Sequence, residues 1–300
     1  MSLRIWIWLL SLSVLWGGSF FFAKVATAEL RPLTVVFGRV AFAAVALNVV
    51  LVATNRNPFR RTAPWATYLT MGLLNNLVPF SLIFWGQTHI AVGLASILNA
   101  TTPLFTLVVA HLLTADERIT GAKASALLIG LVGVALLLGP GILLQADAST
   151  WGEVACLGAA LSYAFAGIYG RRFKAMGIAP LEAASGQVTA STLLILPIML
   201  AVDRPWMLPA VPAATTWAAL IALALLSTAL AYVLYFRILA AAGATNLLLV
   251  TFLIPPIGVA LGAAFLGERL GLRHFEGMAL IGVGLAIIDG RIWRLVRRAK

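Results

Sequence analysis

Long apolar segments alternate with short polar connections along almost the whole chain. Each apolar segment holds about 20 residues, the length that a helix needs to cross a hydrocarbon layer of about 30 Å. The connections carry charges and helix breakers, as in the segment from Asn55 to Pro58. The pattern predicts ten membrane-spanning helices, at residues 3–24, 32–53, 66–88, 91–113, 121–139, 151–170, 181–202, 214–237, 244–266 and 273–291.

Composition decides which solvent these segments meet. Hydrophobic residues make up 62% of the 300 residues, charged residues make up 10%, and the mean hydropathy is +1.01. A chain this apolar has too few polar side chains to cover a water-soluble domain. We therefore expect an all-α membrane protein with the bilayer as its solvent.

The net charge of +11 reflects where the basic residues lie. They sit at the ends of the predicted spans and do not line one polar face, so we expect no nucleic-acid partner. With the N-terminus in the cytoplasm, fifteen Lys and Arg residues fall on the cytoplasmic side and five on the other. The positive-inside rule then predicts that both termini are cytoplasmic. A compact chain without insertions favours a plasma membrane, the inner membrane of a bacterium.

The first span has a second interpretation, as a cleaved signal peptide. A basic residue precedes its apolar run, and the segment Ala26-Thr27-Ala28 resembles a cleavage site. The sixth span argues against cleavage, because Tyr163 and Arg171 take the places that Trp16 and Lys24 hold in the first span. We therefore expect the first span to stay in the protein.

The second half of the chain repeats features of the first half. Glu117, Arg118, Gly133 and Gly139 recur at an offset of 151 residues as Glu268, Arg269, Gly284 and Gly290. The offset predicts two repeats of five spans each, at residues 1–145 and 146–300. Because five is an odd number of crossings, the second repeat enters the membrane upside down relative to the first.

Inverted repeats are the architecture of many secondary transporters, which hold their substrate between the repeats near the middle of the bilayer. The predicted fold is therefore ten helices arranged as two inverted five-helix repeats around a central cavity, and it suits transport by alternating access. The simpler alternative is a duplication that only built a stable bundle, because a fold alone does not establish a function.

Several motifs lie along nearly the whole chain. They are Leu15–Phe20 with Lys24, Pro32 with Arg39, Pro103, Gly121, and Leu266–Leu270 followed by Gly277, Ile281 and Gly284. With these motifs the chain resembles the drug/metabolite transporter superfamily, in its branch of ten-helix exporters with EamA domains. The first copy of the Gly-Glu-Arg-Leu motif departs from the pattern. The resemblance implies export of small metabolites, most like the exporters of aromatic and neutral amino acids.

Nucleotide-sugar carriers share this fold and are an alternative. A substrate bearing phosphates would demand several cationic groups inside the bundle, and Arg39 is the basic residue that lies clearly within a span. We expect Arg39 to snorkel outward or to meet a buried structural partner. If its guanidinium faced inward instead, it would suit a substrate carboxylate.

The positions of the acidic residues indicate whether transport is coupled to protons. All of them fall within about one or two turns of a predicted helix end. A buried carboxylate proton relay is therefore not expected, which favours facilitated exchange or uniport over proton coupling. Glu117 and Glu268 are the candidates for interfacial proton antiport. Their simpler role is to pair with Arg118 and Arg269 at the lipid headgroups.

Polar and aromatic side chains recur at helical spacing on the third, fourth, eighth and ninth spans, where lipid would leave polar groups unsatisfied. We expect them to line a cavity, with Asn99 as the strongest candidate. The candidate substrate-binding residues are Trp16, Asn76, Phe80, Phe84, Ser96, Asn99, Thr102, Tyr163, Thr228, Tyr232, Tyr235, Asn246 and Phe252. Amides, hydroxyls and aromatic faces suit a small amphipathic solute. The alternative is hydrogen bonding between helices without a ligand.

Helix breakers add candidate hinges. Pro103 in the fourth span and Pro255-Pro256 in the ninth remove backbone donors at equivalent depth. They predict interrupted helices whose free carbonyl groups line the cavity. Gly17 and Gly18 suit bending or close helix packing equally well.

Other classes of protein fit the sequence poorly. An intramembrane enzyme would need a nucleophile with a base, a metal cluster or paired carboxylates, and His89, His111 and His274 are scattered on different spans. A channel would favour rings of charge. We expect no cofactor and no metal, a small-molecule substrate, lipid as the surrounding partner, and a monomer or weak dimer.

Overall fold

The structure is a computed structural model that describes residues 2–54, 63–115, 117–139, 147–208, 210–247 and 249–289. All regular elements in these ranges are helical. The predicted repeat boundary between residues 145 and 146 falls outside the described residues. The elements are α1 (Leu3–Thr27), α2 (Pro32–Ala53), α3 (Trp65–Gly72), η1 (Leu73–Leu77), α4 (Val78–Gln87), α5 (Val92–Asn99), α6 (Thr102–Leu113), α7 (Gly121–Leu138), α9 (Ala148–Tyr169), α10 (Arg171–Ala175), α11 (Pro180–Val202), η2 (Pro205–Met207), α12 (Ala214–Ala224), η3 (Leu225–Leu230), α13 (Ala231–Leu247), α14 (Leu249–Leu266) and α15 (Leu272–Asp289).

Nine helical segments of the described ranges are long and apolar enough to cross a membrane. They correspond to the first nine predicted spans, and the third, fourth, sixth and eighth are each assembled from shorter elements. The tenth predicted span corresponds to α15, which is not among the nine and carries Arg273, His274 and Glu276 in its first turns. The prediction of an all-α membrane protein is confirmed, while the tenth crossing stays a prediction.

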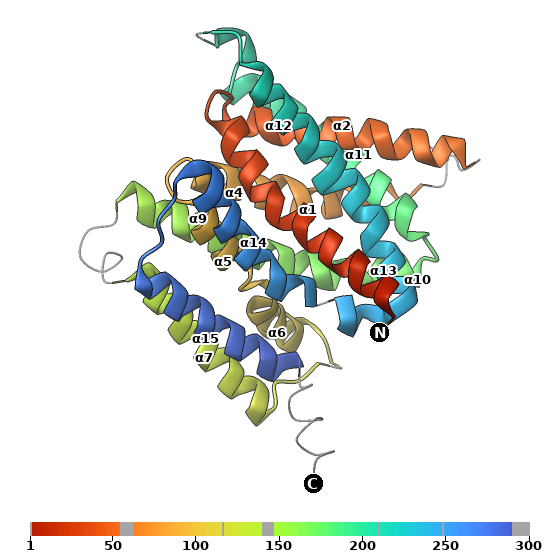
Figure 1. Cartoon of the computed structure of the whole chain (residues 1–300). Helices are drawn as coiled ribbons and strands as arrows, with labels where there is room; N and C mark the ends of the chain where they lie inside the picture. The colour runs from red at the N-terminus through yellow and green to blue at the C-terminus, as the bar shows by residue number, and fades with distance from the viewer. Residues whose placement is uncertain are drawn as a thin grey trace.

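Helices from the two halves of the chain pack in pairs: α1 with α14, α2 with α11, α4 with α9, and α7 with α15. Figure 1 shows α7 and α15 side by side along one edge of the molecule. Glycines set the close approach, since a Cβ on Gly86 of α4 would lie 2.7 Å from the carbonyl oxygen of Gly152 in α9. In lipid, van der Waals contact at such small residues is a main source of helix association.

Two carboxylates cap helices that belong to the opposite half of the chain. Glu29, after α1, accepts hydrogen bonds from the Ala213 N–H (2.7 Å) and the Thr216 hydroxyl (2.6 Å) at the start of α12. Asp203, after α11, accepts from the N–H (2.6 Å) and hydroxyl (3.0 Å) of Thr34 at the start of α2. An anionic acceptor at a helix N-terminus satisfies N–H groups that have no partner within the helix.

The Glu29 cap predicts a pH dependence of stability. The hydrogen bonds from the Thr216 hydroxyl and the Ala213 N–H lower the pKa of the Glu29 carboxyl. A lowered pKa in the folded protein means that the cap stabilises it fully above the ordinary carboxyl pKa of about 4.3 and progressively less as the pH falls below it. We expect the difference in melting temperature between wild type and Glu29→Gln, measured in detergent from pH 7 to pH 3, to shrink in that acid range.

The exposed Glu276 offers a control for this measurement, since its side chain makes no hydrogen bond with the described residues. Glu276→Gln is expected to shift the melting temperature little across the same range. A difference between wild type and Glu29→Gln that stays constant down to pH 3 would show that the carboxylate does not stabilise α12.

Candidate functional site

Two π-helical turns shape the middle of the third and eighth spans. The first, η1, holds Asn75 and Asn76, and the second, η3, holds Ser227 and Thr228. A π-helical turn inserts an extra residue into an α-helix and is frequent at functional sites. Hydrophobic periodicity does not predict these turns. They occupy corresponding spans in the two halves of the chain.

The side chains of η1 reach across to α11. The Asn75 amide donates to Gln187 Oε1 (3.1 Å) and to the Tyr232 hydroxyl oxygen (3.3 Å). The Asn76 amide donates to Ser191 Oγ (2.9 Å), and the Tyr232 hydroxyl donates to Asn76 Oδ1 (3.4 Å). Amide and hydroxyl groups from both halves are thus joined at the middle of their spans.

Arg39 lies beside this network and is 6% exposed. Its Nε donates to Thr228 Oγ1 of η3 at 3.0 Å. The guanidinium carbon lies 3.7 Å from the ring centroid of Phe80 and 5.7 Å from that of Phe84. The expectation that Arg39 snorkels outward is therefore wrong, and the alternative of a buried partner holds, because two aromatic faces and a hydroxyl solvate the cation inside the bundle.

We call this group of residues the central cluster. Tyr163 belongs to it because it lies within electrostatic range of the Arg39 guanidinium. The central cluster consists of Arg39, Asn75, Asn76, Phe80, Phe84, Tyr163, Gln187, Ser191, Thr228 and Tyr232. Trp16 and Tyr235 form an aromatic pair, with ring centroids 5.8 Å apart, and Tyr235 is within electrostatic range of Tyr232.

The central cluster includes residues that the sequence analysis left out of the site. Asn75 precedes a predicted site residue, and Gln187 holds the place in the second half that Arg39 holds in the first. Asn75 and Asn76 are adjacent amides in the middle of an apolar span, and this pair could have indicated that Asn75 also belongs to the site. Ser191 carried no signal of its own, because an isolated serine in a span often bonds only its own helix.

The polar stripe of the fourth span serves other contacts. Ser96 Oγ donates to the Gly93 carbonyl (2.7 Å), and Thr102 Oγ1 donates to the Asn99 carbonyl (2.7 Å). A Cβ on Gly258 of α14 would lie 2.7 Å from Ser96 Cβ, so Ser96 packs between helices. Among the described residues no hydrogen bond joins Asn99 to the central cluster. Its Oδ1 is buried and accepts no hydrogen bond from the described part of the chain, which leaves an acceptor open.

The predicted break at Pro103 is present, because α5 ends at Asn99 and α6 begins at Thr102. The break predicted at Pro255-Pro256 is wrong, since α14 runs without interruption through both prolines. The helix continues although the two prolines remove two backbone donors. In the second half the interruption lies instead in α13, where Gly243 has φ 77°.

Gly17 and Gly18 serve packing of α1. A Cβ on Gly17 would lie 2.7 Å from the Ile257 side chain of α14, and a Cβ on Gly18 would meet Phe22 and Leu261 at 3.7 and 3.9 Å. Both glycines lie within the continuous helix α1. The packing alternative therefore holds for Gly17, which the neighbouring helix directly covers.

An apolar cavity of about 200 Å³ lies between the α5–α6 break, α14 and α15. Its lining includes Ile97, Ala100 and three residues that the sequence analysis singled out, Phe252, Pro255 and Pro256. No member of the central cluster lines it. Asn246 donates to the Ala242 carbonyl of its own helix at 2.7 Å. These residues are therefore not brought into the central cluster.

Charged side chains lie at both ends of the span formed by α5 and α6. At the end where α5 begins, which we call the Glu268 end, Glu268 accepts from the N–H groups of Val92 (2.8 Å) and Gly93 (3.3 Å). Lys24 is within electrostatic range of Glu268 and donates to the carbonyl groups of Gln87 and Ile90. The expectation that Glu268 only pairs with Arg269 is wrong, because its carboxylate caps α5.

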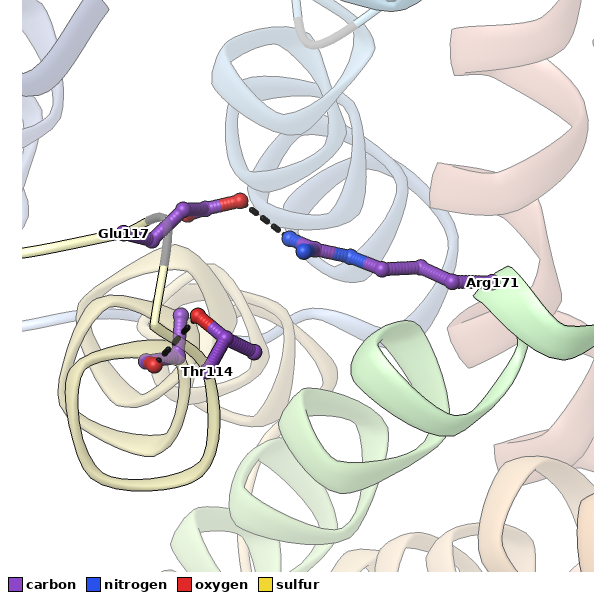
Figure 2. Close-up of polar contacts among 4 residues, drawn as sticks. Thr114, Glu117 and Arg171 are labelled. Carbon is purple, nitrogen blue, oxygen red and sulfur yellow. Dashed lines mark hydrogen bonds and ion pairs between the residues drawn. The ribbon is translucent and has the colours of Figure 1, made fainter.

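At the opposite end, which we call the Glu117 end, Glu117 forms an ion pair with Arg171. Figure 2 shows this pair joining the loop after α6 to the start of α10, beside Thr114. The expected pairing of Glu117 with Arg118 is therefore wrong. Arg171 is the ion-pair partner of Glu117 because it lies at the start of α10, within reach of the loop that carries Glu117. The two side chains are 37% and 44% exposed.

Comparison with known proteins places this geometry in context. The model of the EamA-like transporter family matches residues 3–139 and 150–289. A relative named "Uncharacterized transporter YoaV", from Bacillus subtilis, is 25% identical over 94% of this chain and 95% of its own length. A relative named "Probable terminal-alkyne amino-acid exporter", from Streptantibioticus cattleyicolor, is 26% identical over 95% and 93%.

Two further similarities extend the comparison. A protein of Salmonella typhimurium named "Probable amino-acid metabolite efflux pump" is 26% identical, over 91% of this chain and 91% of its own length. A solved crystal structure of a protein with 18% identity has a TM-score of 0.66, covering 95% of this chain and 96% of the other. At that identity the structural likeness concerns the fold alone.

Proposed function

We infer the function from one premise: the chain belongs to the EamA-like transporter family. It is a multi-pass membrane transporter. We propose that it exports amino acids, aromatic and neutral, or similar small metabolites, from the cytoplasm across the inner membrane of a bacterium. Two of the relatives carry names of amino-acid exporters or efflux pumps, which supports this substrate class.

The central cluster is the observation that carries the proposal. It brings a cation, amides, hydroxyls and aromatic rings from both halves of the chain together within their spans, where Arg39 and Gln187 lie about two turns from the helix ends. Polar groups at this depth must find partners inside the bundle, and in transporters such places mark the substrate pathway. A small solute with charged groups and an apolar side chain would fit this cluster. Its charged groups would meet the cation, amides and hydroxyls, and its side chain would pack against the aromatic rings.

The proposed transport cycle uses inverted repeats, residues 1–145 and 146–300, that rock against each other. Equivalent charges support this. Lys24 lies within electrostatic range of Glu268 at one end of the α5–α6 span, and their counterparts Arg171 and Glu117 form an ion pair at the other. In the proposed cycle the two ends open alternately, and each opening separates its own pair of charges.

The charge bias of the sequence sets the proposed orientation. Most basic residues outside the spans fall on the side of the Glu117 end, which we place in the cytoplasm together with both termini. The Glu268 end then faces outward.

We propose facilitated exchange or uniport as the mode of transport. None of the residues in the central cluster is acidic, so the proposed site has no carboxylate to carry a proton. Proton antiport is the second candidate, and one observation favours it: Glu153 of α9 is 4% exposed, and its Oε2 accepts no hydrogen bond from the described residues. A buried carboxyl group of this kind can exchange a proton during a transport cycle.

Counterflow in proteoliposomes tests the proposal. Labelled L-phenylalanine or L-leucine is expected to exchange against the unlabelled amino acid at equal pH on both sides. Asn75→Leu should lower the rate at least about tenfold, because Gln187 and Tyr232 lose a hydrogen-bond partner in a buried site. Thr70→Ala is the matched control in the same span, since Thr70 lies outside the central cluster and its hydroxyl bonds the Ala66 carbonyl of its own helix.

The same vesicles separate the two modes of transport. Exchange that proceeds without a pH gradient supports the uncoupled mode. Flux that requires a pH gradient and disappears in Glu153→Gln would favour proton antiport. Failure of every amino acid and related metabolite to exchange would overturn the proposed substrate class.

A further inference from the structure

Among the described residues, no counter-ion contacts the charge of Arg39. Arginine stays protonated in proteins, and burying an unpaired charge costs several kcal/mol even after relaxation. Among the described residues no carboxylate contacts Arg39, whose one hydrogen bond is to the neutral hydroxyl of Thr228. The rings of Phe80 and Phe84 offset part of the cost, because a cation over an aromatic face is stabilised.

The geometry leaves one edge of the guanidinium open. Phe80 and Phe84 are stacked, with ring centroids 6.1 Å apart and an angle of 7° between their planes, and the guanidinium carbon lies over the Phe80 face. Nε bonds Thr228, while the two terminal nitrogens donate no hydrogen bond to the described residues. Arg39 as a whole keeps an exposure of 6%. A planar guanidinium held in this way can bind a carboxylate with two parallel hydrogen bonds.

The rest of the central cluster limits the charge of the ligand. Gln187, which holds the corresponding place in the second half, contributes a neutral amide that bonds Asn75. One cation without an acidic neighbour favours a ligand with a single anionic group. It disfavours a free amine, which would meet the guanidinium as a like charge, and a diphosphate, which would need more cations.

We propose that Arg39 binds the carboxylate of the transported molecule, so that the substrates are amino acids or other monocarboxylates and exclude amines and amides of the same shape. This inference rests on the proposed transport function and specifies the chemical group that the site selects. Phe80 and Thr228 act as positioning residues, because they hold the guanidinium plane and its Nε.

Four probes that share one aromatic side chain test the inference in proteoliposomes: L-phenylalanine, L-phenylalanine amide, phenethylamine and phenylacetate. In wild-type protein we expect the two carboxylates to exchange at least about tenfold faster than the amide and the amine, since a charge-assisted hydrogen bond is lost with the carboxylate. This comparison needs no variant and so does not depend on how a mutant folds.

Variants then assign the selection to Arg39. Arg39→Gln, which introduces the amide found at the corresponding position 187, should lower the exchange of both carboxylates about tenfold or more. It should not lower the amide and amine rates, because removing the guanidinium also removes a like charge. Arg39→Lys keeps the charge but loses the paired donors, so it should retain an intermediate rate. Arg31→Gln is the matched control, because Arg31 is exposed at the start of the same helix.

The outcomes separate this inference from the proposed function. Equal exchange of phenylalanine and its amide in wild type, or unchanged selectivity in a folded Arg39→Gln protein, would overturn the role of Arg39 and leave amino-acid transport standing. Arg39-dependent exchange of phenylacetate without exchange of any amino acid would support the carboxylate site and overturn amino-acid export. No flux of any probe would overturn both.

Discussion

Gly277→Ala is expected to lower the free energy of unfolding by about 2–3 kcal/mol, because the methyl group overfills a closely packed helix contact. Its Cβ would lie 2.6 Å from Leu137 Cγ and 2.9 Å from the Gly133 carbonyl oxygen in α7. The carbonyl belongs to a helix backbone and cannot turn aside as a flexible side chain would. The loss should appear as a lower melting temperature in detergent and a smaller yield of monodisperse protein.

Gly282→Ala is the matched control in the same helix. Apart from the adjacent residues and backbone of its own helix, no atom of the described residues lies within 4 Å of a Cβ at this position. Alanine also favours helix over glycine by up to about 1 kcal/mol. The two substitutions are therefore expected to shift stability in opposite directions. If both raised the melting temperature, α7 and α15 would not pack through Gly133 and Gly277.

Glu268→Gln is expected to slow exchange about tenfold or more while the protein stays folded. The substitution removes the negative charge that caps the N-terminus of α5 and that lies near Lys24. Charge-assisted hydrogen bonds of this kind contribute about 1.5–3 kcal/mol, enough to shift the equilibrium between closed and open states of this end by tenfold or more. Initial rates of amino-acid counterflow measure the effect.

Glu276→Gln removes a carboxylate nearby in the sequence from an exposed position of α15 and serves as the control. Its rate should stay close to that of wild type. An unchanged rate in Glu268→Gln would show that closure of the Glu268 end does not limit transport, and the proposed role of the charge pair would then fail.

The membrane spans could be predicted from the sequence because their length and apolar composition are fixed by the bilayer. The second span, predicted at 32–53, is the helix Pro32–Ala53. Local breaks were harder to predict. Proline removes a donor wherever it lies, but whether the helix bends depends on its neighbours: α5 and α6 separate near Pro103, while α14 stays continuous through Pro255 and Pro256.

The site could be predicted only in part. Helical spacing identified residues on the third and eighth spans, and Asn76, Phe80, Phe84, Thr228 and Tyr232 do meet in the central cluster. The same reasoning failed for the fourth span, because a hydroxyl bonded to its own helix has the same spacing as one that lines a cavity.

The placement of Arg39 depended on contacts that one helix cannot reveal. The length of its side chain allows both an outward and a buried position. The rings that solvate it come from α4, and the hydroxyl that orients it lies in a π-helical turn of the eighth span. Hydrophobic periodicity carries no information on such a turn, so the buried position could be recognised only from the assembled fold.

The accessibility of a cysteine in the central cluster tests the central claim most directly. The variant is Asn75→Cys in a Cys156→Ser background, which removes the single native cysteine. A membrane-impermeant maleimide is applied from either face of the membrane. Val45→Cys, at a 64% exposed position in the middle of α2, is the control that should face lipid and react from neither side.

A central site that opens alternately predicts that the cysteine at position 75 reacts from both faces and that L-phenylalanine slows both reactions. Adding Glu268→Gln should speed labelling from the Glu268 side, and adding Glu117→Gln should speed it from the Glu117 side. Labelling from one face alone, unchanged by either substitution and by the amino acid, would contradict alternating access to the central cluster.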